Sequence, residues 1–101
     1  MNNETKESTA AVVQPEGDLA GAALPPFRAK LRDMVAAGTL HLTVDLAHAQ
    51  MVDSAGIGLL ISAHNSLKKA GGELAVIHAS KDILDLFRTM RIHQHFSVCG
   101  D

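Results

Sequence analysis

Residues 40–60 read LHLTVDLAHAQMVDSAGIGLL, and this stretch decides the fold. Apolar and polar side chains alternate strictly over residues 40–46, which predicts a β-strand with one apolar face. After a short connection, the apolar period changes from two residues to that of a helix beginning at Ser54. The apolar face of this helix would hold Ile57, Leu60, Ile61, His64 and Leu67. A strand that leads through a short connection into an amphipathic helix predicts an α/β domain.

The chain beyond this helix repeats the strand–helix order. Gly71 and Gly72 are predicted to stop the helix after Lys68 and Lys69, two cations suited to its negative end. Residues 73–78, ELAVIH, have the length and composition of a strand. Ser80 is predicted to cap another helix. The apolar face of that helix would hold Ile83, Leu86, Phe87 and Met90. Residues 96–98 are predicted to form a last short strand.

The chain before the central strand holds one more strand and one more helix. Residues 10–14 predict a strand that stops at Pro15, because proline lacks the amide proton that a sheet ladder needs. A helix is predicted between Leu24 and Gly38. Its apolar face would hold Leu24, Phe27, Leu31, Met34 and Val35. Residues 1–9 are predicted to be a disordered lead, and residues 10–101 a single domain.

The composition limits the functions open to such a domain. The 101 residues carry 9 Lys and Arg against 11 Asp and Glu, a formal charge of −2, and neither Trp nor Tyr. A broad basic face or an aromatic platform for nucleic acids is therefore not expected. No stretch approaches the roughly 20 apolar residues that cross a bilayer. The single cysteine, Cys99, fits a reducing compartment, so the protein is expected in the cytoplasm, away from membranes.

Three patterns that point to cofactors or metals lack their supporting residues. Gly56 and Gly58 look like a dinucleotide-binding turn, which needs a third small residue where this chain has Ile61. Of the six histidines only His93 and His95 are close in sequence, and no Cys or carboxylate stands at a familiar ligand spacing beside them. His64 is predicted to be a hydrogen-bonded core histidine. Asp45 ends a strand as the acceptor of a receiver domain does, but no acidic pair for Mg²⁺ follows an early strand. No metal and no cofactor are expected.

The start of the central helix, at Asp53 and Ser54, admits two interpretations. In the structural one, Ser54 caps the helix, and the glycines after it allow close packing against the sheet. In the functional one, the hydroxyl lies beside free amides and the positive end of the helix dipole, where a phosphate is tolerated. Phosphorylation would then add about −1.5 to −2 charge to the surface without disturbing the fold. The spacing alone favours the structural interpretation, because serines are common at helix N-caps, and it leaves the functional one open.

At these residues the sequence resembles a known family. Residues 53–60, DSAGIGLL, look like the signature of STAS domains, and specifically of bacterial anti-sigma factor antagonists. Residues 17–19 (GDL), 68–74 (KKAGGEL) and 83–87 (ILDLF) resemble other family motifs in the same order. The resemblance covers residues 10–98, and the coincidence of several motifs makes it fairly specific.

The resemblance implies a fold and a mechanism. The STAS fold is an α/β fold with a central mixed sheet of about four strands, flanked by helices in alternating β-α order. Ser54 is the implied phosphoacceptor of an ATP-dependent serine kinase that is also the partner, a kinase-type anti-sigma factor. Phosphorylation would break the complex, and a PP2C-type phosphatase would restore it. The partner-binding residues implied are Asp18, Asp53, Ala55, Gly56, Ile57, Gly58 and Leu59. A protein of this kind is a regulator, not an enzyme.

The sequence also departs from the family pattern. Ala55 stands where many relatives have a second hydroxyl, and Ala20 where an aspartate often occurs near the acceptor. One of the two usual leading strands is expected to be missing or reduced, and a final helix to be absent. A different function stays open: STAS-like domains also serve as constitutive subunits of phospholipid or anion transport complexes. The oligomeric state is not predicted.

Overall fold

The computed structural model describes residues 9–100. All of the predicted disordered lead except Thr9 lies outside the described residues. The elements in chain order are β1 (Ala10–Val13), η1 (Gly21–Ala23), α2 (Leu24–Ala36), β2 (His41–Asp45), α3 (Ser54–Lys69), β3 (Glu73–Ile77), α4 (Lys81–Thr89), η2 (Ile92–Gln94) and β4 (Ser97–Val98). The predicted β-α-β-α-β-α-β order is confirmed, and two short 3-10 helices, η1 and η2, are added to it.

The four strands form one sheet in the order β1-β2-β3-β4, and every pair is parallel. Val12, Thr43, Ala75 and Ser97 lie in one row across the sheet. The expectation of a mixed sheet is corrected here for the described strands. Each connection contains a helix that carries the chain back to the edge where the previous strand began, so successive strands run the same way.

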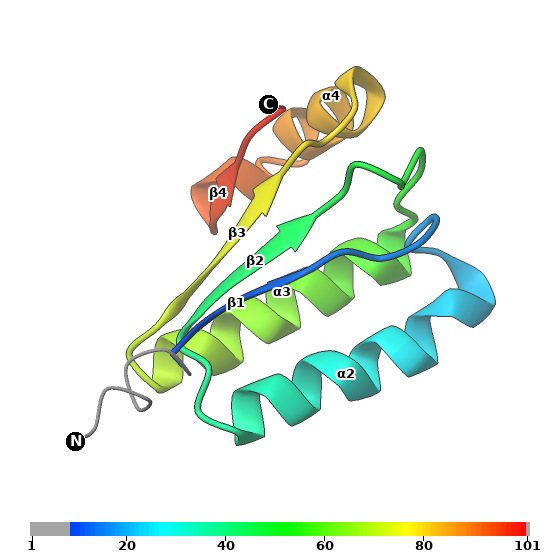
Figure 1. Cartoon of the computed structure of the whole chain (residues 1–101). Helices are drawn as coiled ribbons and strands as arrows, with labels where there is room; N and C mark the ends of the chain where they lie inside the picture. Colours follow the sequence, from blue (N-terminus) through cyan, green and yellow to red (C-terminus); the bar gives the residue numbers. More distant parts are fainter. Residues whose placement is uncertain (1–8, 101) are drawn as a thin grey trace.

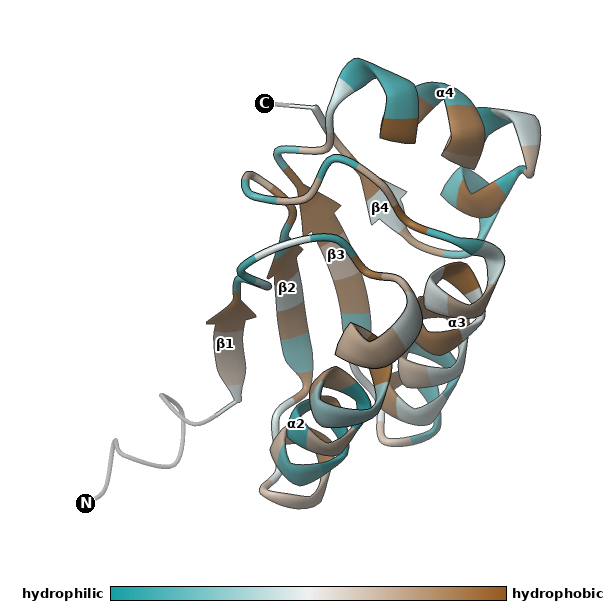
Figure 2. Ribbon diagram, turned by 90° about the vertical axis from the view of Figure 1, so that its right-hand side faces the viewer, coloured by the Kyte–Doolittle hydropathy of each residue, from teal (hydrophilic) through white to brown (hydrophobic). Residues whose placement is uncertain are grey.

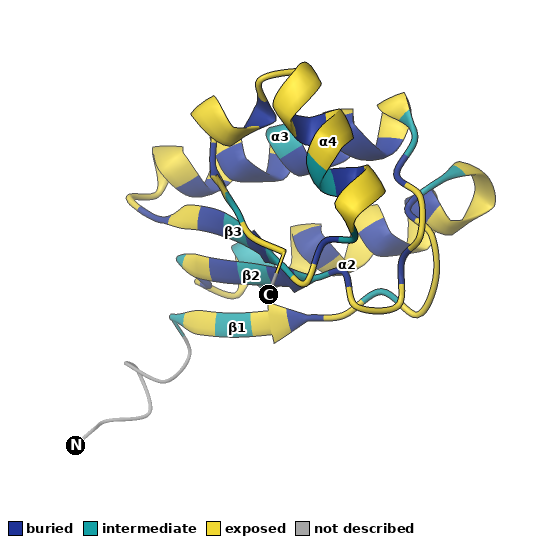
Figure 3. Ribbon diagram, turned by 90° about the horizontal axis from the view of Figure 1, so that it is seen from above, coloured by how far each residue is buried: buried dark blue, intermediate teal, exposed yellow. Residues whose placement is uncertain are grey.

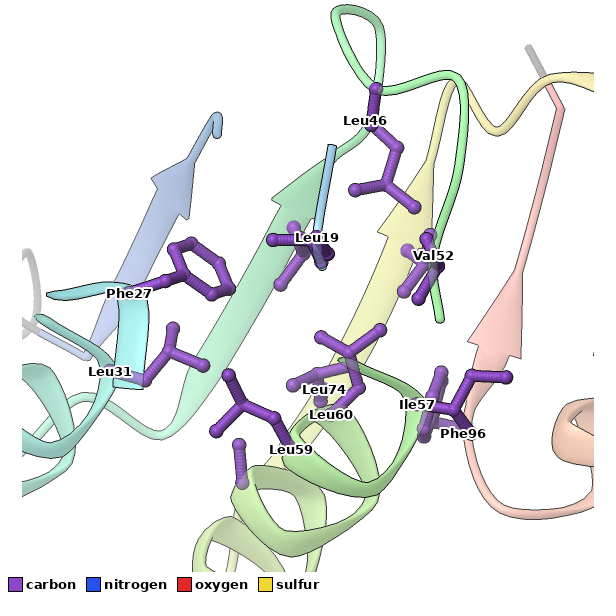
Figure 4. Close-up of a cluster of buried hydrophobic side chains, with 14 of the residues drawn as sticks. Leu19, Phe27, Leu31, Leu46, Val52, Ile57, Leu59, Leu60, Leu74 and Phe96 are labelled. Carbon is purple, nitrogen blue, oxygen red and sulfur yellow. The ribbon is translucent and has the colours of Figure 1, made fainter. Parts of the chain in front are cut away.

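Helices α2 and α3 lie side by side on one face of the sheet, and α4 lies at the β3–β4 side, away from β1 (Figures 1 and 2). The alternate residues of β2 and β3 that face α2 and α3 are buried, whereas their neighbours are half-buried or exposed. The core fills the space between sheet and helices (Figure 4). Leu60 and Leu67 of α3 are fully buried in it. Burial of each such side chain stabilises the fold by about 1.5–3 kcal/mol.

Some predicted boundaries and faces are wrong. The third strand ends at Ile77, one residue early, because His78 turns into the left-handed region with φ 58°. Helix α4 buries Ile83 and Phe87, while Leu86 and Met90 are 36% and 46% exposed. A short helix beside the last strand packs along one narrow stripe only, so the neighbouring apolar positions face solvent (Figure 3).

The connection from β2 to α3 passes close to the chain that leaves β1. Leu19 and Val52 form an isolated parallel bridge. The Leu19 amide donates to the Met51 carbonyl at 3.1 Å, and the Asp53 amide donates to the Leu19 carbonyl at 3.2 Å. These bonds hold the start of α3 against the β1–α2 connection, and they fix the position of the Asp53-Ser54 pair.

Candidate functional site at the start of helix α3

The predicted cap of α3 is wrong by one residue. Asp53, not Ser54, is the N-cap, and its Oδ1 accepts a hydrogen bond from the Gly56 amide at 2.7 Å. Its other oxygen, Oδ2, accepts from the Gly21 amide at 3.3 Å. The aspartate therefore caps α3 and reaches the start of η1 as well. A carboxylate next to the positive end of a helix dipole is favourable, which explains why the aspartate takes this place.

Ser54 consequently becomes the first residue of α3, and its hydroxyl is not used by the cap. The side chain is exposed, and within residues 9–100 its hydroxyl has no hydrogen-bond partner. The backbone amides of Ser54 and Ala55 likewise have no acceptor in this part of the chain. The helix start thus presents one free hydroxyl beside two free amide donors.

Asp18, a predicted partner-binding residue, ties two connections together. Its Oδ1 accepts from the Gln50 amide at 2.7 Å and from the Met51 amide at 3.1 Å. These bonds link the β1–α2 connection to the β2–α3 connection just before the Asp53-Ser54 pair. Asp18 is exposed, so it supports the site and still lies on its surface.

Gly56 is required by the close approach of the Leu19 backbone. A Cβ atom at position 56 would collide with the Leu19 carbonyl oxygen and would lie 3.0 Å from a Val52 methyl group. Among the described residues, nothing lies within 4 Å of the corresponding point at Gly58. The two glycines of the motif therefore have different roles, since only the first is needed for packing.

The remaining predicted partner-binding residues divide into two groups. Ile57 and Leu59 are 3% and 4% exposed and belong to the hydrophobic core, so their side chains offer a partner little surface. Their part in partner binding stays a prediction. Their helical positions turn them towards the sheet. Ala55 and Gly58 are exposed beside Ser54. The sequence reasoning missed Met51, which is 51% exposed just before this turn. Its place in a connection gave no periodic signal.

A second polar cluster lies at the ends of the first three strands. Asp45 accepts hydrogen bonds from the Ala47 amide at 2.9 Å and from Gln14 Nε2 at 3.0 Å, and its Oδ1 lies 2.9 Å from His78 Nδ1. The bond with His78 is the main reason that the pKa of the Asp45 carboxyl is lowered. All its oxygens are engaged in joining β1, β2 and β3. This arrangement is a structural clamp and differs from an open acceptor aspartate.

The predicted hydrogen bond of His64 is absent within residues 9–100. His64 is buried in α3, its Nδ1 has no hydrogen-bond partner among these residues, and its ring lies 5.5 Å from the Phe96 ring between centroids. Burial lowers the pKa of this histidine, with the Lys68 charge as the next cause. Within residues 9–100, no three His, Cys, Asp or Glu side chains are grouped so that they could hold a metal ion. The described residues also contain no helix long and apolar enough to span a membrane.

Comparison with known proteins places this geometry in a family. A family model described as Mlab, STAS domain, matches residues 2–98. An anti-sigma F factor antagonist of Paenibacillus polymyxa is 30% identical over 61 residues, which are 54% of this chain and 52% of that protein. The chain therefore spans about half the length of this curated relative.

Solved structures agree on the fold. A Thermotoga maritima protein described as a candidate anti-sigma factor antagonist superposes with a TM-score of 0.84 at 14% identity, covering 90% of this chain and 79% of that one. The unphosphorylated form of the anti-sigma factor antagonist SpoIIAA gives a TM-score of 0.79 at 17% identity, covering 90% and 80%. Together with the match over residues 2–98, these likenesses identify the chain as a member of the STAS domain family.

Proposed function

We propose that this chain is an anti-sigma factor antagonist whose binding is switched by phosphorylation of Ser54. In its unphosphorylated form it binds a serine kinase-type anti-sigma factor, and phosphorylation releases that partner. A PP2C-type phosphatase restores the binding form. The chain itself performs no catalysis, and the use of ATP by the kinase places the cycle in the cytoplasm.

The observation that carries the proposal is the free hydroxyl at the start of α3. Because Asp53 takes the cap, Ser54 is exposed and its hydroxyl is unbonded within residues 9–100. A kinase can reach it without opening the helix. The likeness to an anti-sigma F factor antagonist of Paenibacillus polymyxa and to the unphosphorylated form of SpoIIAA supports this choice of function for a chain of this family.

The local chemistry fits transfer of a phosphoryl group to this residue. The γ-phosphorus of ATP forms a bond to Ser54 Oγ as its bond to the ADP oxygen breaks, and the serine proton passes to a base of the kinase. The product phosphate can accept hydrogen bonds from the free amides of Ser54 and Ala55 at the positive end of α3. The fold is therefore expected to tolerate the phosphate.

A docked partner would not tolerate it. The phosphate brings about −1.5 to −2 charge to a chain with a formal charge of −2, and it lies beside the Asp53 carboxylate. A partner that covers this turn would bury the new charge without a counterion. The loss of complementarity at a buried contact costs about 2–5 kcal/mol, enough to abolish a micromolar complex.

The first test is incubation with the kinase-type anti-sigma factor encoded nearest to this gene, with Mg²⁺ and ATP. Mass spectrometry of the intact protein and of its peptides is expected to find one phosphoryl group, on Ser54. The Ser54→Ala variant should stay unmodified, while Ser97→Ala, which changes an exposed serine on β4, should be modified normally. Phosphate on another residue, with Ser54→Ala still modified, would overturn the proposal.

The second test measures binding of the same partner by titration calorimetry. Ser54→Ala is expected to keep the affinity of the unmodified protein, and Ser54→Asp to weaken it at least tenfold, because only the aspartate adds charge. Equal affinities for the two variants would contradict the switch.

A second candidate function is a constitutive subunit of a phospholipid or anion transport complex. The matching family model is described by the STAS domain of Mlab and not by an antagonist, which is the observation that favours it. Such a subunit would dock through the same fold without a phosphorylation cycle. Stable co-purification with an ATP-binding cassette protein, with no phosphate found on Ser54, would decide for this candidate.

A further inference from the structure

Helices α2 and α3 lie side by side on one face of the sheet (Figures 1 and 2). A groove lies between their side chains. We call it the α2–α3 groove. One stripe of each helix lines it, with Arg28, Leu31, Arg32 and Val35 on α2, and Leu59 and Ser62 among the residues on α3. Its cavity volume is about 270 Å³. The α2 residues from position 28 to position 36 extend for about 12 Å, or roughly two helical turns.

The groove has an apolar floor and polar walls. Leu31 and Leu59 form its floor and are 2% and 4% exposed, whereas Arg28, Arg32 and Ser62 at its walls are exposed. These floor side chains are already almost fully shielded from water, so a side chain that enters the groove would gain close packing contacts with them. A space of this size accepts one or two large aliphatic side chains.

The charges of the groove are uncompensated. Within residues 9–100, neither Arg28 nor Arg32 has a hydrogen bond or an ion pair, and no acidic residue lines the groove. Two guanidinium groups one helical turn apart favour carboxylates on whatever enters. The chain as a whole is weakly acidic, so this local excess of positive charge is not a consequence of composition.

We propose that the α2–α3 groove binds an acidic amphipathic helix of a partner protein. Leucine-like side chains of that helix fill the floor between Leu31 and Leu59, and flanking carboxylates pair with Arg28 and Arg32. Helices laid in apolar grooves are recognised by anchors at such spacings. A flat apolar partner would leave the two arginines unpaired.

The groove joins the surface that carries Ser54. Ala55, Leu59 and Ser62 follow one another at helical spacing along α3, so the groove starts about one turn after Ser54. The inference rests on the proposed function to this extent: the same partner would cover Ser54 with one part and fill the groove with its acidic helix. The groove would then supply affinity, while Ser54 supplies the switch.

The test uses the purified protein and two synthetic, helix-stabilised peptides. One peptide has leucines along one face and glutamates on both flanks, and the other has lysine in place of every glutamate. Chemical-shift mapping with the isotope-labelled protein should show amide shifts in the groove stripes of α2 and α3 with the acidic peptide. The acidic peptide should bind at least tenfold more tightly than the basic one, and less tightly at high salt.

Charge reversal gives the decisive control. The double variant Arg28→Glu/Arg32→Glu is expected to reverse the preference, binding the basic peptide more tightly. Arg32→Glu should weaken the acidic peptide at least fivefold, whereas Lys30→Glu should change its affinity less than twofold, because Lys30 is on α2 but does not line the groove. Ser62→Trp should block both peptides by filling the space from an exposed position. Unchanged circular dichroism verifies the fold of each variant.

Four results of this experiment would contradict the proposal for the α2–α3 groove. Equal binding of the two peptides, no binding, or shifts confined to residues outside the groove would each overturn the proposal. Groove shifts that depend on protein concentration without any peptide would assign the groove to a second copy of the chain, which would also overturn it. Neither kinase nor ATP is present in this experiment, so its failure leaves the Ser54 switch standing, and failure of the switch leaves the groove result standing.

Discussion

Helices α3 and α4 both begin beside a serine, and the two serines differ in one hydrogen bond. At α4, Ser80 is the N-cap, and its hydroxyl accepts from the Ile83 amide at 3.2 Å. At α3, Asp53 is the N-cap, and Ser54 comes one residue later with an exposed hydroxyl. The hydroxyl that caps a helix is engaged and half-buried. The hydroxyl that follows a capping aspartate is available.

This difference shows how a small domain can expose a hydroxyl for modification at a helix start that other residues hold in place. The cap and the Asp18 bonds hold the start of α3 without any help from Ser54. Chemistry at the serine and stability of the helix are therefore carried by separate residues. At α4 both would fall on Ser80, so a modification there would remove the cap.

The largest expected effect on stability comes from the close contact between Gly56, at the start of α3, and the Leu19 backbone. Gly56→Ala should lower the free energy of unfolding by about 2–3 kcal/mol, because the new Cβ would collide with the Leu19 backbone carbonyl, which cannot swing away. Urea denaturation followed by circular dichroism measures the change. The start of α4 has no glycine, although the chain after β4 approaches it, since the Ala79 amide donates to the Cys99 carbonyl at 3.1 Å.

Gly58→Ala is the matched control, since no atom of the described part of the chain lies within 4 Å of the added atom. It should raise the free energy of unfolding by roughly 0.5–1 kcal/mol, because alanine loses less backbone freedom in a helix than glycine does. If both variants destabilised the protein equally, the close approach of Leu19 would not be what requires Gly56.

The next effect compares the two caps directly. Asp53→Ala should cost about 1–2 kcal/mol, because it removes the bond from the Gly56 amide and the bond from the Gly21 amide. Ser80→Ala removes one bond only and should cost about 1 kcal/mol. The same denaturation experiment measures both.

Asp53→Asn serves as the control for charge, since an asparagine oxygen can still cap the helix. It should lose less stability than Asp53→Ala. If Ser80→Ala lowered the free energy of unfolding more than Asp53→Ala does, the prediction would be wrong, because the Asp53 cap would then not stabilise its helix more strongly than the Ser80 cap.

Much of the fold could be predicted from the sequence because burial leaves periodic marks. The alternation over residues 40–46 and the helical period after residue 54 both led to elements that are present. The direction of the strands could not be read from such periods, since an antiparallel strand shows the same alternation. Leu86 and Met90 were predicted to be buried but are exposed. The apolar pattern of a short helix does not indicate how much of its apolar face a neighbouring element covers.

The candidate site was harder to predict in its details. Both Asp53 and Ser54 are good caps, and their order does not reveal which one takes the bond. Two carboxylates accept hydrogen bonds from residues about thirty positions away in the sequence. Asp18 accepts from the amides of Gln50 and Met51, and Asp53 accepts from the Gly21 amide. No local sequence pattern indicates such long-range bonds. Ile57 and Leu59 belong to the motif for packing reasons, so the motif alone could not separate core from surface.

The pH dependence of the free energy of unfolding distinguishes the contribution of the buried His64 from that of the two helix caps. His64 of α3 is buried, and its pKa is lowered from the ordinary value of 6.5. The unfolded chain therefore binds a proton more readily than the folded one, so stability is full above pH 6.5 and falls as the pH drops below it. Denaturation midpoints across this range should show the loss, and His64→Leu should flatten it. The caps are best compared above pH 6.5, where this histidine stays neutral in both states.

The smallest expected effect on stability belongs to Ser54 itself. Ser54→Ala should change the free energy of unfolding by less than about 0.5 kcal/mol, because an exposed side chain with no hydrogen bond within residues 9–100 contributes little. Ser80→Ala in the same assay provides the contrast, since its hydroxyl is engaged. A loss for Ser54→Ala as large as that for Ser80→Ala would mean that Ser54 supports the helix after all. A near-zero value beside abolished phosphorylation would place the role of Ser54 in signalling, because the residue that the helix needs least would be the one that the partner needs most.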